Sequence, residues 1–409
     1  MNQPVSYSKS VFSAGVIVAA IGYFVDIYDL LLFSIVRKTS IESLGYSGSE
    51  IEQYGLWLIN IQMTGMLLGG ILWGIWADKK GRLSVLFGSI LLYSVANILN
   101  GFAQNIEQYA ILRFIAGVGL AGELGAGITL VTESLEVNKR GIGTMIVGGI
   151  GILGAVFAGI LSHYFEWRMC YFIGGGLGLL LLILRIGVLE SGIYKNIASS
   201  NAQRGNFLKL FRNTKTIFKY LNCIIIGLPT WFAVGILVTF SPEFAQILHI
   251  NGEIKGGDAI MCAYFGISTG DFLCGWLSQL LRSRRKAIAI FVLITAIGYL
   301  LYFTAYNQSA FYLYLCMYII GFGTGFWAVV ITNAAEQFGT NIRATVATTV
   351  PNFIRGALPL ITLFYAALQT FFNKLVSAEI VAVFIIILPL TSLYFLEETF
   401  DKNLDYIEK

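Results

Sequence analysis

Long apolar runs recur along the whole sequence, and they restrict the possible folds more than any other feature. Inside a bilayer every backbone polar group has to be paired within the protein, so a run of about 20 apolar residues predicts a transmembrane helix. The runs fall near residues 11–36, 52–76, 83–104, 106–132, 141–163, 167–189, 220–242, 257–281, 286–306, 309–335, 343–372 and 376–396. The sequence therefore predicts an all-α membrane protein with twelve transmembrane helices.

The composition excludes a large soluble protein. Hydrophobic residues make up 56% of the chain and charged residues only 12%, whereas a soluble domain carries about 25% charged residues. A soluble core would still need a charged surface around it. The first run, 11–36, is too long for the apolar part of a signal peptide, so it is predicted to be the first membrane span.

Metal, cofactor and catalytic motifs are not found in the sequence. Five cysteines lie widely spaced in apolar runs, without a CxxC motif or a Cys/His cluster. We therefore expect no metal site and no cofactor. The sequence also has no nucleophile–histidine constellation and no nucleotide-binding loop, so we expect neither an enzyme nor a nucleic-acid partner.

The positions of the basic residues predict the orientation in the membrane. If the N-terminus is inside, most of the 27 Lys and Arg lie in the loops on the cytoplasmic side. The opposite loops hold only Arg37, Lys38, Arg168, Lys255 and Lys374. Because cytoplasmic loops are enriched in Lys and Arg, both termini are predicted to be cytoplasmic. We expect a monomer that crosses the bacterial inner membrane many times.

An internal repeat divides the chain into two halves. The segment "GMLLGGILWGIWADKKGR" aligns with "GISTGDFLCGWLSQLLRSRR", and "ESLEVNKR" aligns with "EQFGTNIR", at nearly the same offset. Parallel repeats of this kind are a transporter architecture. The predicted parts are a six-helix half at 1–190, a basic cytoplasmic linker with a surface helix at 191–219, and a second six-helix half at 220–409.

A few charged residues lie within the predicted spans, where a charge costs about 2.5–3.5 kcal/mol on insertion scales and therefore points to a function. Asp26 and Asp29 share one face of the first span. The opposite directions of spans one and four place Asp29 at a depth similar to that of Arg113. A carboxylate balanced between an arginine, burial and a second carboxylate is suited to proton coupling. The alternative is a permanent ion pair between the two spans.

Three further charges lie in the spans, and the first two of them allow two interpretations each. Glu123 follows a glycine-rich stretch and is predicted to bind a proton or a substrate amine, or else to satisfy backbone groups at the span end. Arg355 lies between Pro351 and Pro359, which should loosen its helix, and its guanidinium suits a substrate carboxylate. The alternative is a buried salt bridge. Asp271 is expected to be structural.

Residues 74–82, "GIWADKKGR", resemble the loop motif of the major facilitator superfamily. With the twelve spans, the repeat and "RFIAGVGLAGE", this resemblance covers nearly the whole chain. It implies that charged pairs at the cytoplasmic helix ends act as a gate that breaks as the halves rock. The corresponding residues are Gly74, Asp78, Gly81, Arg82, Glu133, Arg140, Glu336 and Arg343.

Two further segments narrow the resemblance. "GYFVDIYDLLLF" is similar to a pattern of metabolite:proton symporters, and the whole combination is similar to the phagosomal transporters of intracellular bacteria. In this superfamily spans one, four, seven and ten line the central cavity. The resemblance implies that the lining includes Tyr23, Tyr28, Thr230, Trp231 and Asn333, with Asn60 and Gln62 of span two as secondary candidates.

These observations predict a proton-coupled transporter that imports a small polar metabolite, with an amino acid as the expected substrate. A zwitterion needs both charges in its site, and Arg355 with Glu123 or Asp26 would supply them from opposite halves. A nucleoside or sugar symporter of the same fold is the alternative. A membrane sensor that does not transport is a third possibility, although such sensors usually carry a large soluble domain.

Overall fold

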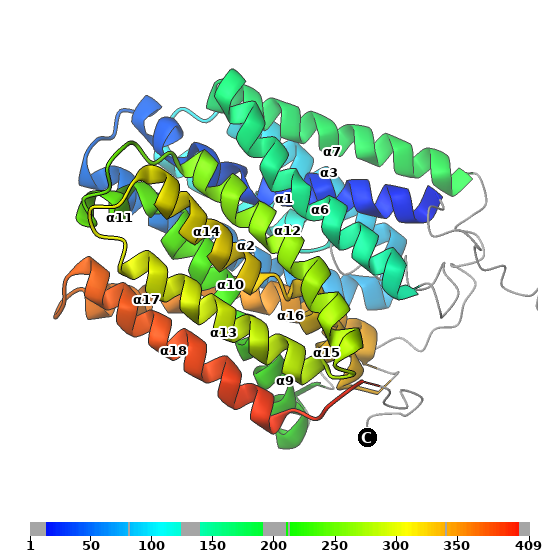
Figure 1. The fold of residues 1–409 in the computed structure, drawn as a ribbon. Coiled ribbons are helices and arrows are strands. Elements are labelled where there is room, and N and C mark those ends of the chain that lie inside the picture. The colour runs from blue at the N-terminus through cyan, green and yellow to red at the C-terminus, as the bar shows by residue number, and fades with distance from the viewer. Residues whose placement is uncertain are drawn as a thin grey trace, which may run out of the picture.

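A computed structural model of the protein describes residues 14–80, 82–123, 140–190, 210–211, 213–339 and 342–400. Side chains are described for all of these except 14–15, 77–83, 140–145, 186–190 and 344. Long helices lie side by side in one bundle, with the connecting loops at its two ends (Figure 1).

The helices of the first half are the following: α1 (Ala14–Ser43), α2 (Ser49–Lys80), α3 (Arg82–Asn100), α4 (Ile106–Leu120), α6 (Arg140–Tyr164) and α7 (Trp167–Glu190). The second half contains α9 (Thr214–Ile226), α10 (Leu228–Phe232), the π-helix η3 (Ala233–Val238), α11 (Ser241–Ile247), α12 (Gly256–Leu280), α13 (Arg284–Phe303), α14 (Ala310–Thr324), α15 (Trp327–Glu336), α16 (Arg343–Gly356), α17 (Leu358–Leu368) and α18 (Lys374–Phe395).

The helices confirm the predicted fold class. In the described residues nine helices are long and apolar enough to cross a membrane, and ten if the bent pair Thr214–Ile226 and Leu228–Val238 is one span. The predicted span 83–104 corresponds to the shorter apolar helix Ser84–Asn100. The predicted span 106–132 is described only as far as Glu123, so its second part lies outside the described residues.

Three spans of the second half are interrupted. The seventh changes from α9 to α10 at Gly227 and then to the π-helix η3, with Pro229 in the first turn of α10. The tenth breaks between α14 and α15. In the eleventh span, α16 ends at Gly356 and α17 begins at Leu358, with Pro359 in its first turn. Proline lacks the N–H that would continue a helix, as expected around Arg355.

The described structure begins the seventh span within the predicted linker 191–219. Helix α9 starts at Thr214 and leads into that span. The Asn213 side chain caps it by accepting a hydrogen bond from the Lys215 N–H at 3.0 Å. Residues 191–209 lie outside the described residues, so the division into 1–190, 191–219 and 220–409 stays a prediction.

Glycines at matching positions of the two halves allow helices to cross closely. A Cβ atom on Gly65 of α2 would collide with the backbone of Phe114 in α4, and one on the aligned Gly266 of α12 would collide with Tyr318 in α14. The absence of a side chain therefore lets the two backbones touch in both halves. Gly65 and Gly266 therefore have equivalent packing roles in the two halves.

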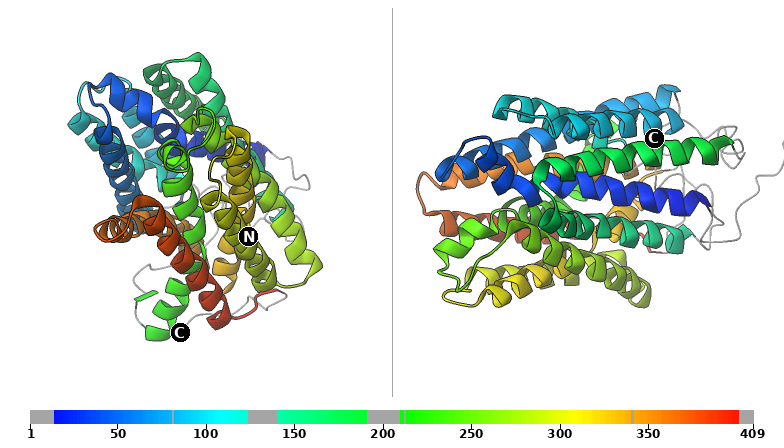
Figure 2. Two further views of the ribbon diagram at one scale, coloured as in Figure 1. Left: turned by 60° about the vertical axis from the view of Figure 1, so that its left-hand side comes forward. Right: turned by 90° about the horizontal axis from the view of Figure 1, so that it is seen from above.

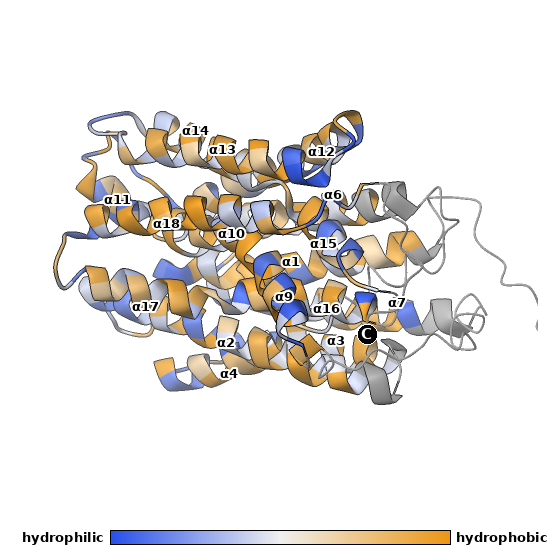
Figure 3. Cartoon of the chain, turned by 90° about the horizontal axis from the view of Figure 1, so that it is seen from below, coloured by the Kyte–Doolittle hydropathy of each residue, from blue (hydrophilic) through white to orange (hydrophobic). Residues whose placement is uncertain are grey.

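The helices of each half pack mainly against one another, and a smaller set of helices forms the interface between the halves. In the first half α1 packs against α6 and α7, and α2 and α3 pack against α4. In the second half α14 packs against α12 and α13, while the halves meet mainly where α6 faces α12 and α2 faces α16 (Figure 2). Hydrophobic residues predominate along the helices (Figure 3), and many large apolar side chains are exposed on them, including Leu72, Ile183 and Leu300. Such a surface requires lipid around it.

Candidate functional site

Arg355 lies at the centre of the most unusual polar cluster in the described interior. Its side chain is 1% exposed, and its Nε and Nη1 atoms have no hydrogen-bond partner among the described residues. The guanidinium carbon lies 5.9 Å from the Trp231 ring centroid and 5.8 Å from the Trp327 ring centroid. Both indole Nε1 atoms also lack partners. Among the described residues no acceptor therefore lies at hydrogen-bond distance from these four buried donor atoms, and a buried polar group left without a partner is costly.

Helix breaks place these three side chains in the cluster. Trp231 belongs to the short helix α10, Trp327 is the first residue of α15, and Arg355 is the last residue but one of α16. None of the described ion pairs includes Arg355, so the expected alternative of a buried salt bridge is not observed. The two indoles hold the cation by their ring faces instead.

One carboxylate of the first half lies near this cluster. Asp26 of α1 is fully buried, and neither of its carboxyl oxygens has a hydrogen-bond partner. The charge of Arg355 acts on Asp26 and also on Tyr23 of the same helix. Tyr23 is 4% exposed and therefore belongs to the same buried region. The cluster thus contains a cation from one half and an anion from the other.

Asp29 and Arg113 form a second polar group deeper in the first half. Asp29 is fully buried with both carboxyl oxygens unpartnered, and the charge of Arg113 acts on it. Their expected proximity is therefore observed, but no described ion pair joins them. Arg113 instead donates to the amide oxygens of Asn97 and Gln62, the latter at 3.4 Å, and lies 4.9 Å from the Tyr171 ring.

Glu123 has a partner that the sequence did not reveal. Its carboxylate accepts hydrogen bonds from both terminal nitrogens of Arg185 in α7, one of them at 3.1 Å. The Glu123 side chain is 2% exposed and the Arg185 side chain 3%. Bidentate arginine–carboxylate pairs are among the stronger hydrogen-bonded contacts. Arg185 was visible as a charge within a span, and this signal could have marked it as a candidate.

The other predicted lining residues are divided among several places. The Tyr28 hydroxyl donates to the Cys170 carbonyl at 2.8 Å, and Gln62 donates to the Leu30 carbonyl at 3.1 Å. Thr230 lies beside Trp231, and its hydroxyl donates to the Thr324 carbonyl at 3.5 Å. The structure therefore brings Tyr23, Asp26, Thr230, Trp231 and Arg355 into one region, and it adds Trp327.

Two predicted lining residues lie near contacts between segments. Asn60 of α2 accepts a hydrogen bond from Thr362 of α17 at 3.0 Å and so joins the two halves. Asn333 of α15 accepts one from Thr399 near the C-terminal end of the described chain at 3.1 Å. Asn333 is thus tied to the segment that follows α18.

The described gate residues make contacts at the predicted cytoplasmic end. Glu336 pairs with Arg284 of α13 at 3.5 Å and accepts from Thr399 at 2.7 Å. Arg343 donates to the Phe338 carbonyl at 3.3 Å, and Gly74 faces Thr349 across the halves. The side chains of Asp78, Gly81, Arg82, Glu133 and Arg140 lie outside the described residues.

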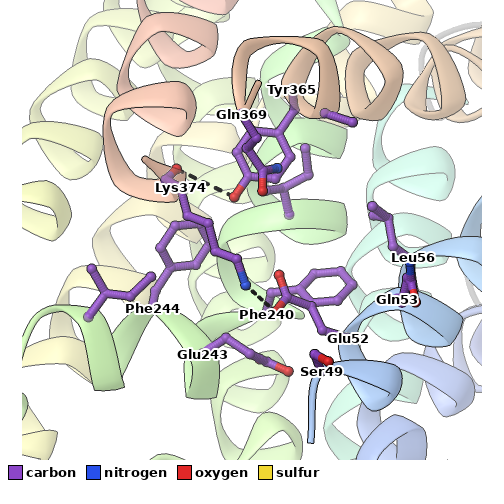
Figure 4. Close-up of a pocket in the computed structure, with 13 residues that line it drawn as sticks. Ser49, Glu52, Gln53, Leu56, Phe240, Glu243, Phe244, Tyr365, Gln369 and Lys374 are labelled. Atoms are coloured by element: carbon purple, nitrogen blue, oxygen red, sulfur yellow. Dashed lines mark hydrogen bonds and ion pairs between the residues drawn. The ribbon is translucent and has the colours of Figure 1, made fainter. Parts of the chain in front are cut away.

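Ion pairs join the two halves at the opposite end, which the charge distribution predicts to be the outer side. Arg37 of α1 pairs with Glu243 of α11 at 2.6 Å, and Lys374 of α18 pairs with Glu52 of α2. Between them is a cavity of about 370 Å³, lined by residues of both halves that include Phe240 (Figure 4). His163 of α6 also contacts Asp258 of α12 at 2.7 Å.

These contacts define the conformation of the bundle. The pairs connect α1 to α11, α2 to α18 and α6 to α12, so they hold the halves together at three places around the same end. A buried polar centre between two halves, closed at one end by breakable contacts, is the architecture of an alternating-access membrane transporter.

Comparison with known proteins gives the family. The sequence profile of the Major Facilitator Superfamily matches residues 19–361. NiaP of Bacillus subtilis (strain 168), described as a candidate niacin/nicotinamide transporter, is 24% identical over 86% of each chain. The sialic acid transporter NanX of Escherichia coli (strain K12) is 26% identical over 82% of this chain and 80% of its own.

A solved structure shows the same fold. The proton:xylose symporter XylE, bound to 6-bromo-6-deoxy-D-glucose, superposes with a TM-score of 0.71, 17% identity and 98% coverage of both chains. The chain belongs to the major facilitator superfamily. It is therefore a multi-pass secondary transporter of small molecules and not an enzyme. The narrower resemblance to the phagosomal branch stays a prediction.

Proposed function

We propose that the protein imports a small cyclic carboxylate together with a proton. The observation that carries this proposal is Arg355, buried between Trp231 and Trp327 with donors of all three side chains unpartnered. A carboxylate would accept hydrogen bonds from the planar guanidinium, and the indole N–H groups could donate to the same anion. The ring faces on both sides suit a flat substrate body.

The names of several relatives support a carboxylate. Niacin and sialic acid are carboxylic acids, and relatives of this chain are described as transporters for them. A benzoate transport protein of Acinetobacter baylyi is 31% identical over 42% of this chain. These substrates share an acid group on a ring. A site with a buried arginine beside two indoles matches that chemistry.

The sequence-based prediction of an amino acid is the second candidate. An amino acid would add an ammonium group, which needs an anion in the same cluster. Asp26 supplies unpartnered carboxyl oxygens within the influence of Arg355. Glu123 is less suited to this role, because its carboxylate already binds Arg185.

Proton coupling is proposed for Asp29, with Asp26 as the second choice. When the outer end opens, water would reach Asp29 and protonate it, which weakens its attraction to Arg113. With the substrate bound, this change would favour closure at the outer end and opening at the other. We further propose a monomer in a bacterial inner membrane with both termini cytoplasmic, because the basic residues are concentrated at that end.

Charge arithmetic gives a test that separates the two candidates. A monovalent carboxylate with one proton crosses as a neutral unit, so its accumulation follows only the pH gradient, about tenfold per pH unit. A zwitterion with one proton carries a positive charge, so a potential of 100 mV adds about 2.3 kcal/mol, or roughly fiftyfold. The experiment is uptake into proteoliposomes, with the pH gradient and the potential imposed separately.

We expect nicotinate or benzoate to accumulate with an acidic exterior and to be insensitive to the imposed potential. Accumulation of an amino acid driven by the potential would favour the second candidate. If only a sugar or nucleoside accumulated, the carboxylate proposal would be wrong and the neutral alternative correct. Binding without any flux of these compounds would favour a sensor.

A further inference from the structure

The two tryptophans beside Arg355 both lie at helix breaks, where the backbone is not held by a continuous helix. A broken helix needs side chains or other backbone groups to pair its freed polar atoms. In this protein the side chains at the two breaks come from α12 and α13. Neither helix carries an unpartnered donor of the Arg355 cluster.

Asp271 of α12 holds the break of the tenth span. Its Oδ1 accepts a hydrogen bond from the Ala328 N–H at 2.9 Å, in the first turn of α15. The residue before that helix, Phe326, provides no side-chain cap. Asp271 therefore performs the capping role from another helix, and its negative charge also suits a helix N-terminus. Trp327 is the residue directly before Ala328, so this bond holds the backbone from which its indole projects.

Close packing fixes Asp271 itself at this break. A Cβ atom on Gly325 would lie 2.7 Å from the Asp271 backbone nitrogen and 2.7 Å from the Gly270 Cα. The two backbones therefore touch where α14 ends, and only a residue without a side chain fits. Asp271 is 7% exposed. A carboxylate held this firmly beside the break leaves Trp327 little freedom.

Tyr299 of α13 holds the break of the seventh span. Its hydroxyl donates to the Pro229 carbonyl at 2.8 Å, two residues before Trp231. Its ring also packs edge-on against Phe232, with centroids 5.4 Å apart. The same tyrosine therefore contacts the residues on both sides of the dipeptide Thr230–Trp231. This is the point where α10 changes to the π-helix.

The two breaks also contact each other, since the Thr230 hydroxyl donates to the carbonyl of Thr324, the last residue of α14. We propose that Asp271 and Tyr299 are positioning residues of the carboxylate site: they hold the two helix breaks that set Trp327 and Trp231 beside Arg355. This inference rests on the proposed function. It adds that substrate recognition is determined by two residues that the substrate does not touch.

The first experiment compares Asp271→Asn with Asp271→Ala in proteoliposomes. An asparagine amide oxygen can still accept the Ala328 N–H, whereas alanine cannot. The probes are nicotinate and nicotinamide, which are the same ring with a carboxylate and with a neutral amide in its place. We expect Asp271→Ala to raise the KM for nicotinate about tenfold, the effect of losing one buried hydrogen bond, with little change in maximal rate. Asp271→Asn should remain close to the unchanged protein.

Tyr299→Phe and Tyr302→Phe provide a matched pair on α13. Tyr302 donates to the Leu237 carbonyl at 2.9 Å, so each change removes one hydroxyl bond to the seventh span. Only the Tyr299 bond lies beside Trp231. We expect Tyr299→Phe to reduce the preference for nicotinate over nicotinamide and Tyr302→Phe to leave that preference unchanged. Equal changes in both variants would overturn the positioning role of Tyr299.

A readout without substrate separates this inference from the proposed function. The fluorescence of each protein minus that of the same protein carrying Trp327→Phe reports the Trp327 indole. Quenching of this difference by acrylamide should increase in Asp271→Ala and stay the same in Asp271→Asn. If no carboxylate is transported but quenching behaves as expected, the proposed function fails and the positioning of Trp327 stands. The inference would be overturned by unchanged quenching in Asp271→Ala. It would also be overturned by an equal increase in quenching in Asp271→Asn and Asp271→Ala.

Discussion

Arg37 and Glu243 form an ion pair at 2.6 Å that joins the first half of the bundle to the second, and the Arg37 side chain is only 2% exposed. The same guanidinium donates to the Thr239 carbonyl and lies 4.3 Å from the Phe240 ring. A second pair at this end, Lys374 with Glu52, is far more exposed at 42% and 25%. The two pairs therefore make unequal contributions to closure of the bundle.

The Arg37–Glu243 pair, in which the arginine is buried, should control opening of this end. Breaking a buried ion pair by removing one partner costs about 3–5 kcal/mol, whereas an exposed pair contributes about 0–1 kcal/mol. We expect Arg37→Met to favour the open state strongly and Lys374→Met to have little effect. The measurement is maleimide labelling of Ile236→Cys, a buried residue that lines the cavity. Equal labelling rates in the two variants would show that the pair does not act as a lock.

Arg355 should be required for carboxylate uptake in a way that charge alone does not satisfy. Arg355→Lys keeps the positive charge but loses the planar group that would bind both carboxylate oxygens. We expect the KM for nicotinate to rise at least about tenfold, since hydrogen bonds to charged groups contribute about 1.5–3 kcal/mol. Full uptake of nicotinate by Arg355→Ala would remove the carboxylate anchor and favour a neutral substrate.

Asp29→Asn should separate transport from proton coupling. Asparagine resembles a permanently protonated carboxylate, so accumulation driven by a pH gradient should stop while exchange of labelled for unlabelled substrate continues. Asp26→Asn serves as the comparison, because Asp26 lies near Arg355 and should mainly change the KM for substrate. If both variants still accumulate substrate with a pH gradient alone, neither residue couples protons. Loss of folded protein in both would indicate a structural pair.

Glu398 should make stability depend on pH outside the membrane region. Burial raises the pKa of its carboxyl, but hydrogen bonds from Ser283 and from the N–H groups of Arg284, Phe400 and Arg285 outweigh this and lower the pKa overall. A folded-state pKa below the unfolded value means that the charged form stabilises the fold. This stabilisation is present above about pH 4.3, the pKa of a free glutamate, and is lost as the pH falls through the lower folded value.

The check on Glu398 is thermal unfolding in detergent between pH 7 and pH 3.5. Because the carboxylate caps the N-terminus of α13 and is partly exposed, Glu398→Gln should cost about 1 kcal/mol at neutral pH. The difference between the two proteins should shrink toward the acidic end. A difference that stays constant with pH would show that the charge of Glu398 does not contribute.

The sequence by itself determined the class of fold and the positions of the buried charges. A bilayer requires about 20 apolar residues per helix, so the length and number of apolar runs leave few alternatives. The cost of burying charge likewise makes Asp26, Asp29, Arg113 and Arg355 stand out without any coordinates. The prolines around Arg355 correctly indicated an interrupted helix, because a missing N–H is a local property.

The tertiary structure alone decided which of these charges are paired. Glu123 and Arg185 are 62 residues apart in sequence and meet through the packing of the first half. Arg355 lies near two indoles from different spans and, among the described residues, within ion-pair distance of no carboxylate, and Asn333 lies beside Thr399. Such contacts depend on the rotation of each helix about its axis and on where it breaks. Both are set by contacts between distant segments, which no local pattern encodes.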